Sequence, residues 1–130
     1  MEIDAADVRA EVEAAFATYE AALVGNDVAV LEGLFHDDPR TIRYGAGENL
    51  YGMEAIRAFR RARSPVGLAR TLRQTVITTY GRDAAVAMTL FTREGSPDRI
   101  GRQSQTWIRF PDGWKVVAAH VSVIAAEAGA

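Results

Sequence analysis

The sequence contains no cysteine and only two histidines, His36 and His120. The absence of cysteine excludes disulfide bonds and thiolate chemistry. The two histidines form no HxH or HExxH pattern, so we expect no metal site, and nothing else in the sequence indicates a cofactor. No apolar run reaches the roughly 18 residues that a membrane-spanning helix needs, and no signal peptide opens the chain. These absences predict a cytoplasmic protein without a membrane partner.

The composition is that of an ordinary globular protein. Of its 130 residues, 48% are hydrophobic and 25% are charged, which is typical of one domain, here residues 1–130. The formal net charge is −2, whereas general nucleic-acid binding needs a basic surface. We therefore expect no nucleic-acid partner.

The two signs of charge are unevenly distributed along the chain. Residues 1–39 contain ten acids and one base, whereas residues 40–130 contain fourteen bases, thirteen of them arginine, and seven acids. Arginine binds carboxylates bidentately, so this excess of arginine favours an anionic ligand. A GC-rich coding bias explains the same excess, and both interpretations stay open for any single exposed arginine.

Apolar periodicity predicts helices first and strands afterwards. Apolar residues recur every three or four positions in three segments, residues 5–24, 28–35 and 53–63, which are expected to be helices. Strands are expected at 41–44, 48–51, 69–80, 84–93, 99–110 and 114–124, separated by Gly, Pro and Asp. Helices followed by a long antiparallel meander predict an α+β fold.

The last predicted strand places polar groups on an otherwise apolar sheet. His120 and Ser122 share one face, because side chains two residues apart in a strand point the same way. We expect this face to line a cavity. The opposite face is apolar and is expected to pair two copies of the chain in a homodimer. Its residues are Val117, Ala119, Val121 and Val123.

The register of the preceding strand depends on the length of the loop at Pro111-Asp112-Gly113. A two-residue loop would place a first set of side chains on the face of His120: Gln103, Gln105 and Trp107. A three-residue loop would instead place Ser104 and Thr106 there. We expect the two-residue loop, with the two glutamines on the face of His120, because two amides beside an imidazole suit a polar, urea-like ligand.

Three pieces of the sequence carry a family resemblance. They are Arg43-Tyr44-Gly45 with Glu48 and Tyr51-Gly52, the FRRAR helix end at 59–63, and GRQSQTWIRFPDGWKVVAAHVS at 101–122. The order of elements resembles the SnoaL-like branch of the nuclear transport factor 2-like superfamily over essentially the whole chain. Together the three pieces resemble the AtzH-like family, associated with cyanuric acid and oxalurate catabolism. The resemblance implies a cone-shaped fold, with three N-terminal helices packed on a bent, mostly antiparallel sheet.

The resemblance also implies a cofactor-independent enzyme. It would remove carboxylate from small N-carboxylated ureas, converting 1,3-dicarboxyurea to allophanate, and Tyr19 and Arg43 would carry the chemistry. The residues alone leave alternatives open, because Tyr19 on its apolar helical stripe would equally suit the core, and Arg43 would equally suit an exposed edge strand. A buried Arg43 without an acidic partner would imply a bound anion.

Further candidates would complete a site for a small anionic substrate. Four arginines lie around the junction between the third helix and the next strand, namely Arg60, Arg63, Arg70 and Arg73. One arginine of this group is expected to form a second carboxylate clamp, with Arg63 and Arg70 as the candidates, although a solvated basic helix end is the alternative for each arginine of this group. Tyr44 and Trp107 are expected in the cavity wall.

In the mechanism that we expect, a tyrosine is the proton donor. Arg43 would bind a substrate oxygen and favour the ionised form of Tyr19, which would protonate the carbamate nitrogen as general acid. The urea core would be held by His120 and one glutamine, Gln103 or Gln105, and a further arginine would bind the distal carboxylate. Ser122 is a further substrate-binding candidate.

Three other functions stay open. A ketosteroid-isomerase-like or cyclase-like enzyme would need a pocket carboxylate, for which Asp38 and Glu48 are the nearby candidates. A non-catalytic anion-binding protein would use the same arginines. A pure oligomerisation domain would have its cone filled by side chains.

Overall fold

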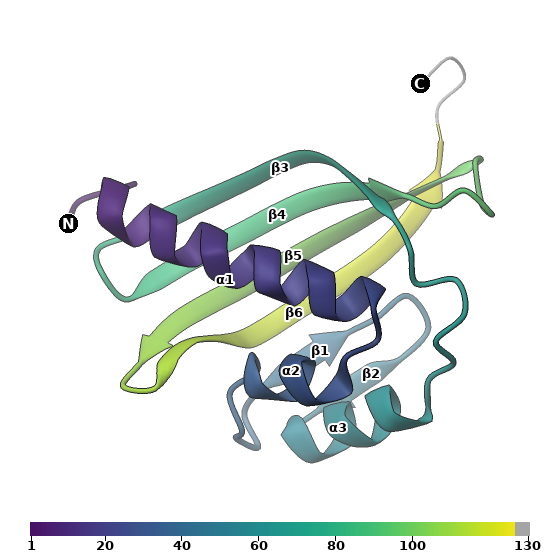
Figure 1. The fold of residues 1–130 in the computed structure, drawn as a ribbon, viewed down its shortest axis with the longest axis horizontal. Coiled ribbons are helices and arrows are strands. Elements are labelled where there is room, and N and C mark those ends of the chain that lie inside the picture. The colour runs from purple at the N-terminus through teal and green to yellow at the C-terminus, as the bar shows by residue number, and fades with distance from the viewer. Residues whose placement is uncertain (127–130) are drawn as a thin grey trace.

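The computed structural model describes residues 1–126, which form three helices and six strands (Figure 1). The helices are α1 (Ala6–Val24), α2 (Val28–Gly33) and α3 (Met53–Ala62). The strands are β1 (Ile42–Tyr44), β2 (Asn49–Tyr51), β3 (Thr71–Tyr80), β4 (Ala84–Thr92), β5 (Arg99–Phe110) and β6 (Gly113–Ala125). The predicted order and type of elements are confirmed.

The strands form one curved sheet in the order β2-β1-β6-β5-β4-β3. All neighbours are antiparallel except β1 and β6, which run parallel. Figure 1 shows α1 crossing one face of the sheet, with α2 and α3 beside β1 and β2 at one end. This arrangement is the predicted α+β cone with helices packed on a bent, mostly antiparallel sheet.

The second helix is shorter than the sequence predicts. Asp27 caps its start, with its side chain accepting a hydrogen bond from the Val30 amide at 3.2 Å. The helix ends at Gly33 rather than at residue 35, because the backbone around Phe35 pairs with β6 instead: the Val116 amide donates to Leu34 and the His36 amide donates to Val116. These bonds bring Phe35 beneath α1.

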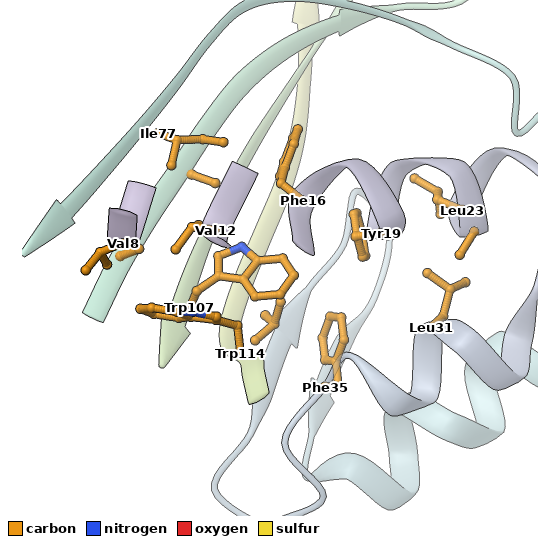
Figure 2. Close-up of a cluster of buried hydrophobic side chains, with 14 of the residues drawn as sticks. Val8, Val12, Phe16, Tyr19, Leu23, Leu31, Phe35, Ile77, Trp107 and Trp114 are labelled. Atoms are coloured by element: carbon orange, nitrogen blue, oxygen red, sulfur yellow. The ribbon is translucent and has the colours of Figure 1, made fainter. Parts of the chain in front are cut away.

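The hydrophobic core lies between α1 and the inner face of the sheet (Figure 2). Val8, Val12, Phe16 and Tyr19 recur at three- and four-residue steps along α1 and are buried, as an amphipathic helix requires. Trp107 and Trp114 pack against this stripe from the strands. These contacts fix α1 on the inner face of the sheet.

The predicted face of the final hairpin is wrong, although the predicted loop length is right. Phe110 pairs with Gly113, which leaves a two-residue loop. A β-bulge then leaves Val117 without a partner, because Trp107 pairs with Val116 and Thr106 pairs with Ala118. One extra residue reverses every later side chain, so His120 pairs with Ser104 instead of facing the glutamines.

The bulge also determines which side chains of β6 point to the core and which lie on the outer face of the sheet. Ala119 packs against the core and Val121 lines an inner cavity, so the apolar face expected at a dimer interface points inward. His120 is exposed on the outer face of the sheet. Separately, none of the helices within residues 1–126 is long and apolar enough to cross a membrane.

Candidate functional site

A cavity of ≈ 330 Å³ occupies the wide end of the cone. It lies between the second half of α1, the connection from α3 to β3, the β1–β2 loop and the inner face of β4, β5 and β6. Its polar lining residues are Tyr19, Arg43, Glu48, Arg63, Arg70, Arg93 and Gln103. Four guanidinium groups therefore face one small space.

Arg43 points into this cavity from the inner face of β1, with its side chain only 10% exposed. Its Nη1 atom donates to Glu48 Oε1 at 2.8 Å, and Glu48 Oε2 accepts from the Gly47 amide at 3.2 Å. Gly45 makes this geometry possible, since a Cβ at this position would overlap the Glu48 carboxylate. The β1–β2 loop thus fixes the direction of the Arg43 guanidinium.

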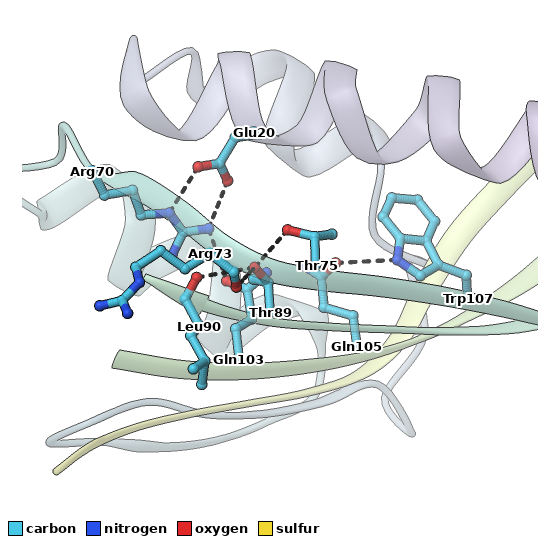
Figure 3. A network of polar contacts seen from close by, with 9 residues as sticks. All are labelled: Glu20, Arg70, Arg73, Thr75, Thr89, Leu90, Gln103, Gln105 and Trp107. Atoms are coloured by element: carbon cyan, nitrogen blue, oxygen red, sulfur yellow. Dashed lines mark hydrogen bonds and ion pairs between the residues drawn. The ribbon is translucent and has the colours of Figure 1, made fainter. Parts of the chain in front are cut away.

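Arg70 is neutralised by a bidentate pair with Glu20 of α1, at 2.9 and 2.6 Å (Figure 3). Its Nη2 atom also donates to Gln103 Oε1 at 3.0 Å. That bond fixes the amide, and the buried Gln103 Nε2 is left without a hydrogen-bond partner in the described part of the chain. Gln103 can therefore donate to a ligand.

Two phenylalanine rings each hold a pair of arginines. The Phe59 ring lies 5.4 Å from the Arg43 guanidinium carbon and 5.9 Å from that of Arg63. The Phe91 ring lies 4.5 Å from the guanidinium carbon of Arg70 and 4.9 Å from that of Arg93. Such cation–π contacts position guanidinium groups without occupying their hydrogen-bond donors.

Arg63 and Arg93 keep buried donors free. Arg63 Nε and Nη2 and Arg93 Nε have no hydrogen-bond partner among residues 1–126. Burial holds the pKa of Arg63 below its usual value, and the charge of Arg43 acts in the same direction. Burial also lowers the pKa of Arg93, next to Arg70. The two side chains are partly exposed, but these shielded nitrogens are costly to leave without a partner, which favours a negative ligand in the cavity.

Tyr19 reaches the cavity from α1 and is only 3% exposed. Its ring packs at 6.3 Å against Phe35 and edge-on at 6.5 Å against Trp107. Aromatic contacts on several sides leave the ring little freedom to move. The Tyr19 hydroxyl is thus a fixed polar group beside the cationic lining.

The structure brings together five of the predicted site residues and separates the others. Tyr19, Arg43, Arg63, Arg70 and Gln103 line the cavity. The remaining predicted residues lie elsewhere, namely Tyr44, Gln105, Trp107, His120 and Ser122. The expectation that His120 and Ser122 share a face with the glutamines is wrong because of the bulge at Val117.

Each of the separated residues has another partner. Trp107 Nε1 donates to Gln105 Oε1 at 3.1 Å inside the core. Ser122 accepts a hydrogen bond from Arg102 on the outer face of the sheet. There, the Tyr44 ring packs edge-on against His120 at 5.9 Å.

Sequence reasoning missed Glu20, Phe91 and Arg93. Phe91 and Arg93 are two residues apart in a strand, which is a signal for a shared inward face. The pairing of Glu20 with Arg70 spans 50 residues and leaves no local signal. Within residues 1–126, no three His, Asp or Glu side chains gather as metal ligands.

Comparisons with known proteins place the chain in a family. It is 65% identical to a protein of unknown function from Pectobacterium atrosepticum SCRI1043, with a TM-score of 0.92 over 94% of each chain. It is 50% identical to a cystatin-like fold protein from Burkholderia xenovorans LB400, with a TM-score of 0.94 over 98% of this chain and 99% of the other.

More distant structures share only the fold. A putative ketosteroid isomerase from Parabacteroides distasonis has a TM-score of 0.69 at 18% identity, over 84% of each chain. No curated protein matches the chain. The AtzH-like family model matches residues 1–127. The chain therefore belongs to the AtzH-like family.

Proposed function

We propose that the cavity binds a small, doubly carboxylated urea and removes one of its carboxylates as CO2. The observation that carries this proposal is the set of buried guanidinium donors without partners in the described chain, on Arg63 and Arg93. The four lining arginines face two carboxylates, Glu20 and Glu48, which leaves two positive charges. A ligand with two negative charges balances them.

The two arginine pairs suggest how such a ligand lies. One carboxylate is bound at the Phe59 end by Arg43 and Arg63, next to Tyr19. The other is bound at the Phe91 end by Arg93 Nε and Gln103 Nε2. The second carboxylate orients the substrate and is retained in the product. A substrate with a single carboxylate would leave one pair of donors buried and unsatisfied.

The chemical step is a proton transfer followed by cleavage of a C–N bond. Tyr19 gives its hydroxyl proton to the nitrogen that carries the carboxylate. The C–N bond then breaks, its electron pair stays on nitrogen, and CO2 leaves as a neutral molecule. The products are a ureide with one carboxylate and CO2, and solvent returns a proton to the Tyr19 phenolate.

The first experiment measures the loss of freshly prepared 1,3-dicarboxyurea against its uncatalysed decay, by ¹³C NMR. The wild-type protein is expected to accelerate the loss, and Tyr19→Phe and Arg43→Gln are each expected to reduce kcat by roughly 10²-fold, the usual scale of acid–base and electrostatic contributions. Tyr44→Phe and Arg102→Gln are the matched controls, because both residues lie on the outer face. They are expected to retain wild-type rates.

Two results would contradict the proposal. Wild-type turnover by a folded Tyr19→Phe protein would remove Tyr19 from the mechanism. No acceleration by the wild-type protein, together with tight binding of a dicarboxylate such as malonate in calorimetry, would make the protein a non-catalytic anion binder.

The isomerase alternative has less support. Such an enzyme needs a carboxylate that is free to accept a proton from a largely apolar substrate. Glu48 lines the cavity, but its two oxygens accept from Arg43 and the Gly47 amide. The cationic lining also disfavours an apolar substrate.

A further inference from the structure

Arg60 is a buried cation that the substrate site does not use. Its residue is 1% exposed, and its three guanidinium nitrogens have no hydrogen-bond partner anywhere in residues 1–126. The next residue, Arg61, is exposed and donates twice to Glu32 across the helix pair. Arg61 thus lies at the solvated basic end of the helix, as one of the alternatives from the sequence had it, whereas Arg60 is buried. A buried, unpaired guanidinium lowers stability, so its presence calls for a role in function.

Arg60 and Tyr19 both contact the ring of Phe35. The guanidinium carbon of Arg60 is 4.4 Å from the centre of the Phe35 ring. The centre of the Tyr19 ring lies 6.3 Å from that of the same Phe35. Figure 2 shows the two side chains next to each other. Tyr19 lines the cavity, whereas Arg60 is set back from the lining residues. Arg60 therefore does not contact a ligand in the cavity directly, whereas Tyr19 can.

Arg60 remains a cation at neutral pH. Burial lowers its pKa to about 10, the Tyr19 oxygen opposes this change, and the charges of Arg43 and Arg63 add to it. The other charged groups that line the cavity with Tyr19 are these same two arginines, from β1 and from the end of α3, Glu48 from the β1–β2 loop, and Arg70 and Arg93 from the sheet side. Glu48 is already paired with Arg43. The guanidinium of Arg60 is thus an uncompensated charge beside the Tyr19 hydroxyl.

We propose that Arg60 is a positioning residue that acts through Tyr19: its buried guanidinium stabilises the phenolate that remains after Tyr19 has given up its proton. The catalytic role of Arg60 rests on the proposed function, in which Tyr19 is the proton donor. A charge held in a water-poor site interacts strongly with a developing negative charge and needs no reorganisation during the reaction. The cost of burying Arg60 in the resting protein is then offset when the phenolate forms.

The test replaces Arg60 by a neutral side chain of similar shape, Arg60→Met. Three properties are measured: the thermal midpoint, the pH at which Tyr19 ionises, and the rate of 1,3-dicarboxyurea loss. Ionisation is followed without substrate, by the ¹³Cζ NMR signal of Tyr19, assigned through its absence from Tyr19→Phe. Arg61→Met is the matched control on the same helix, and Arg60→Lys retains a positive charge.

The expected results separate an electrostatic role from a structural one. Arg60→Met should melt no lower than the wild type, because it removes an unpaired buried charge. Its Tyr19 should ionise at a higher pH than in the wild type, because a nearby positive charge is gone, and its rate should fall by roughly tenfold or more. Arg60→Lys should recover part of both changes, and Arg61→Met should alter neither.

The ionisation measurement decides the inference even if the protein proves not to be a decarboxylase. The same Tyr19 midpoint in the wild type and Arg60→Met would overturn it. A shifted midpoint with no turnover by the wild type would instead retain the Arg60–Tyr19 coupling and refute only the proposed reaction.

Discussion

At the scale of single residues, Gly45 leaves no room for a side chain. A Cβ at this position would overlap the Glu48 carboxylate that orients Arg43. Gly45→Ala is therefore expected to push the flexible Glu48 carboxylate away from Arg43, which then loses the partner that fixes its direction, and to weaken binding of a dicarboxylate by about threefold. Calorimetry with malonate measures the change. Gly47→Ala is the matched control, since a Cβ at Gly47 meets nothing within 4 Å. Equal affinities of the two variants would contradict this account of the loop.

At the scale of secondary-structure elements, Glu20 and Arg70 join α1 to the start of β3. The Arg70 side chain is 2% exposed and that of Glu20 is 17% exposed, so the pair is largely desolvated. Glu20→Gln leaves Arg70 buried with half of its partners, which is expected to lower the free energy of unfolding by about 3 kcal/mol. Urea unfolding measures this change.

The matched control for that prediction is Glu13→Gln on the exposed face of α1. Glu13 pairs with Arg9, and both side chains are about half exposed, so the expected loss is below about 0.5 kcal/mol. Similar losses for Glu20→Gln and Glu13→Gln would mean that the Glu20–Arg70 pair does not hold α1 on the sheet.

The secondary-structure elements also show which features of the fold and the site can be predicted from the sequence. Order and type of helices and strands followed from apolar periodicity, because each element buries one face. Tyr19 and Arg43 as site residues came from family resemblance, since a core tyrosine and an edge arginine have the same local pattern. The face of His120 was wrong, because the bulge at Val117 depends on how β5 and β6 pair and a valine carries no signal of a bulge. Glu20 was missed because its partner is remote in sequence.

For the whole molecule, the two faces of the sheet have different chemistry. The inner face carries the core and the cationic cavity. The outer face carries a row of residues paired from strand to strand, which we call the outer row: Val76, Met88, Ser104, His120 and Tyr44. Val76 is 57% and Met88 53% exposed, which is unusual for large apolar side chains in neighbouring positions.

We expect the outer row to form the homodimer interface. It replaces the face of β6 that the sequence predicted for this role, which points toward the core. A row that crosses five strands can meet its own copy about a two-fold axis that runs along the row, so that each apolar side chain covers its counterpart's exposed surface. Met88→Glu would then bury two unpaired charges and is expected to give a folded monomer in light scattering coupled to gel filtration. Val66→Glu, at an 83% exposed loop position, is the control and should leave the dimer intact. A wild-type protein that stays monomeric at high micromolar concentration would contradict the expectation, and the exposed Val76 and Met88 would then need another partner.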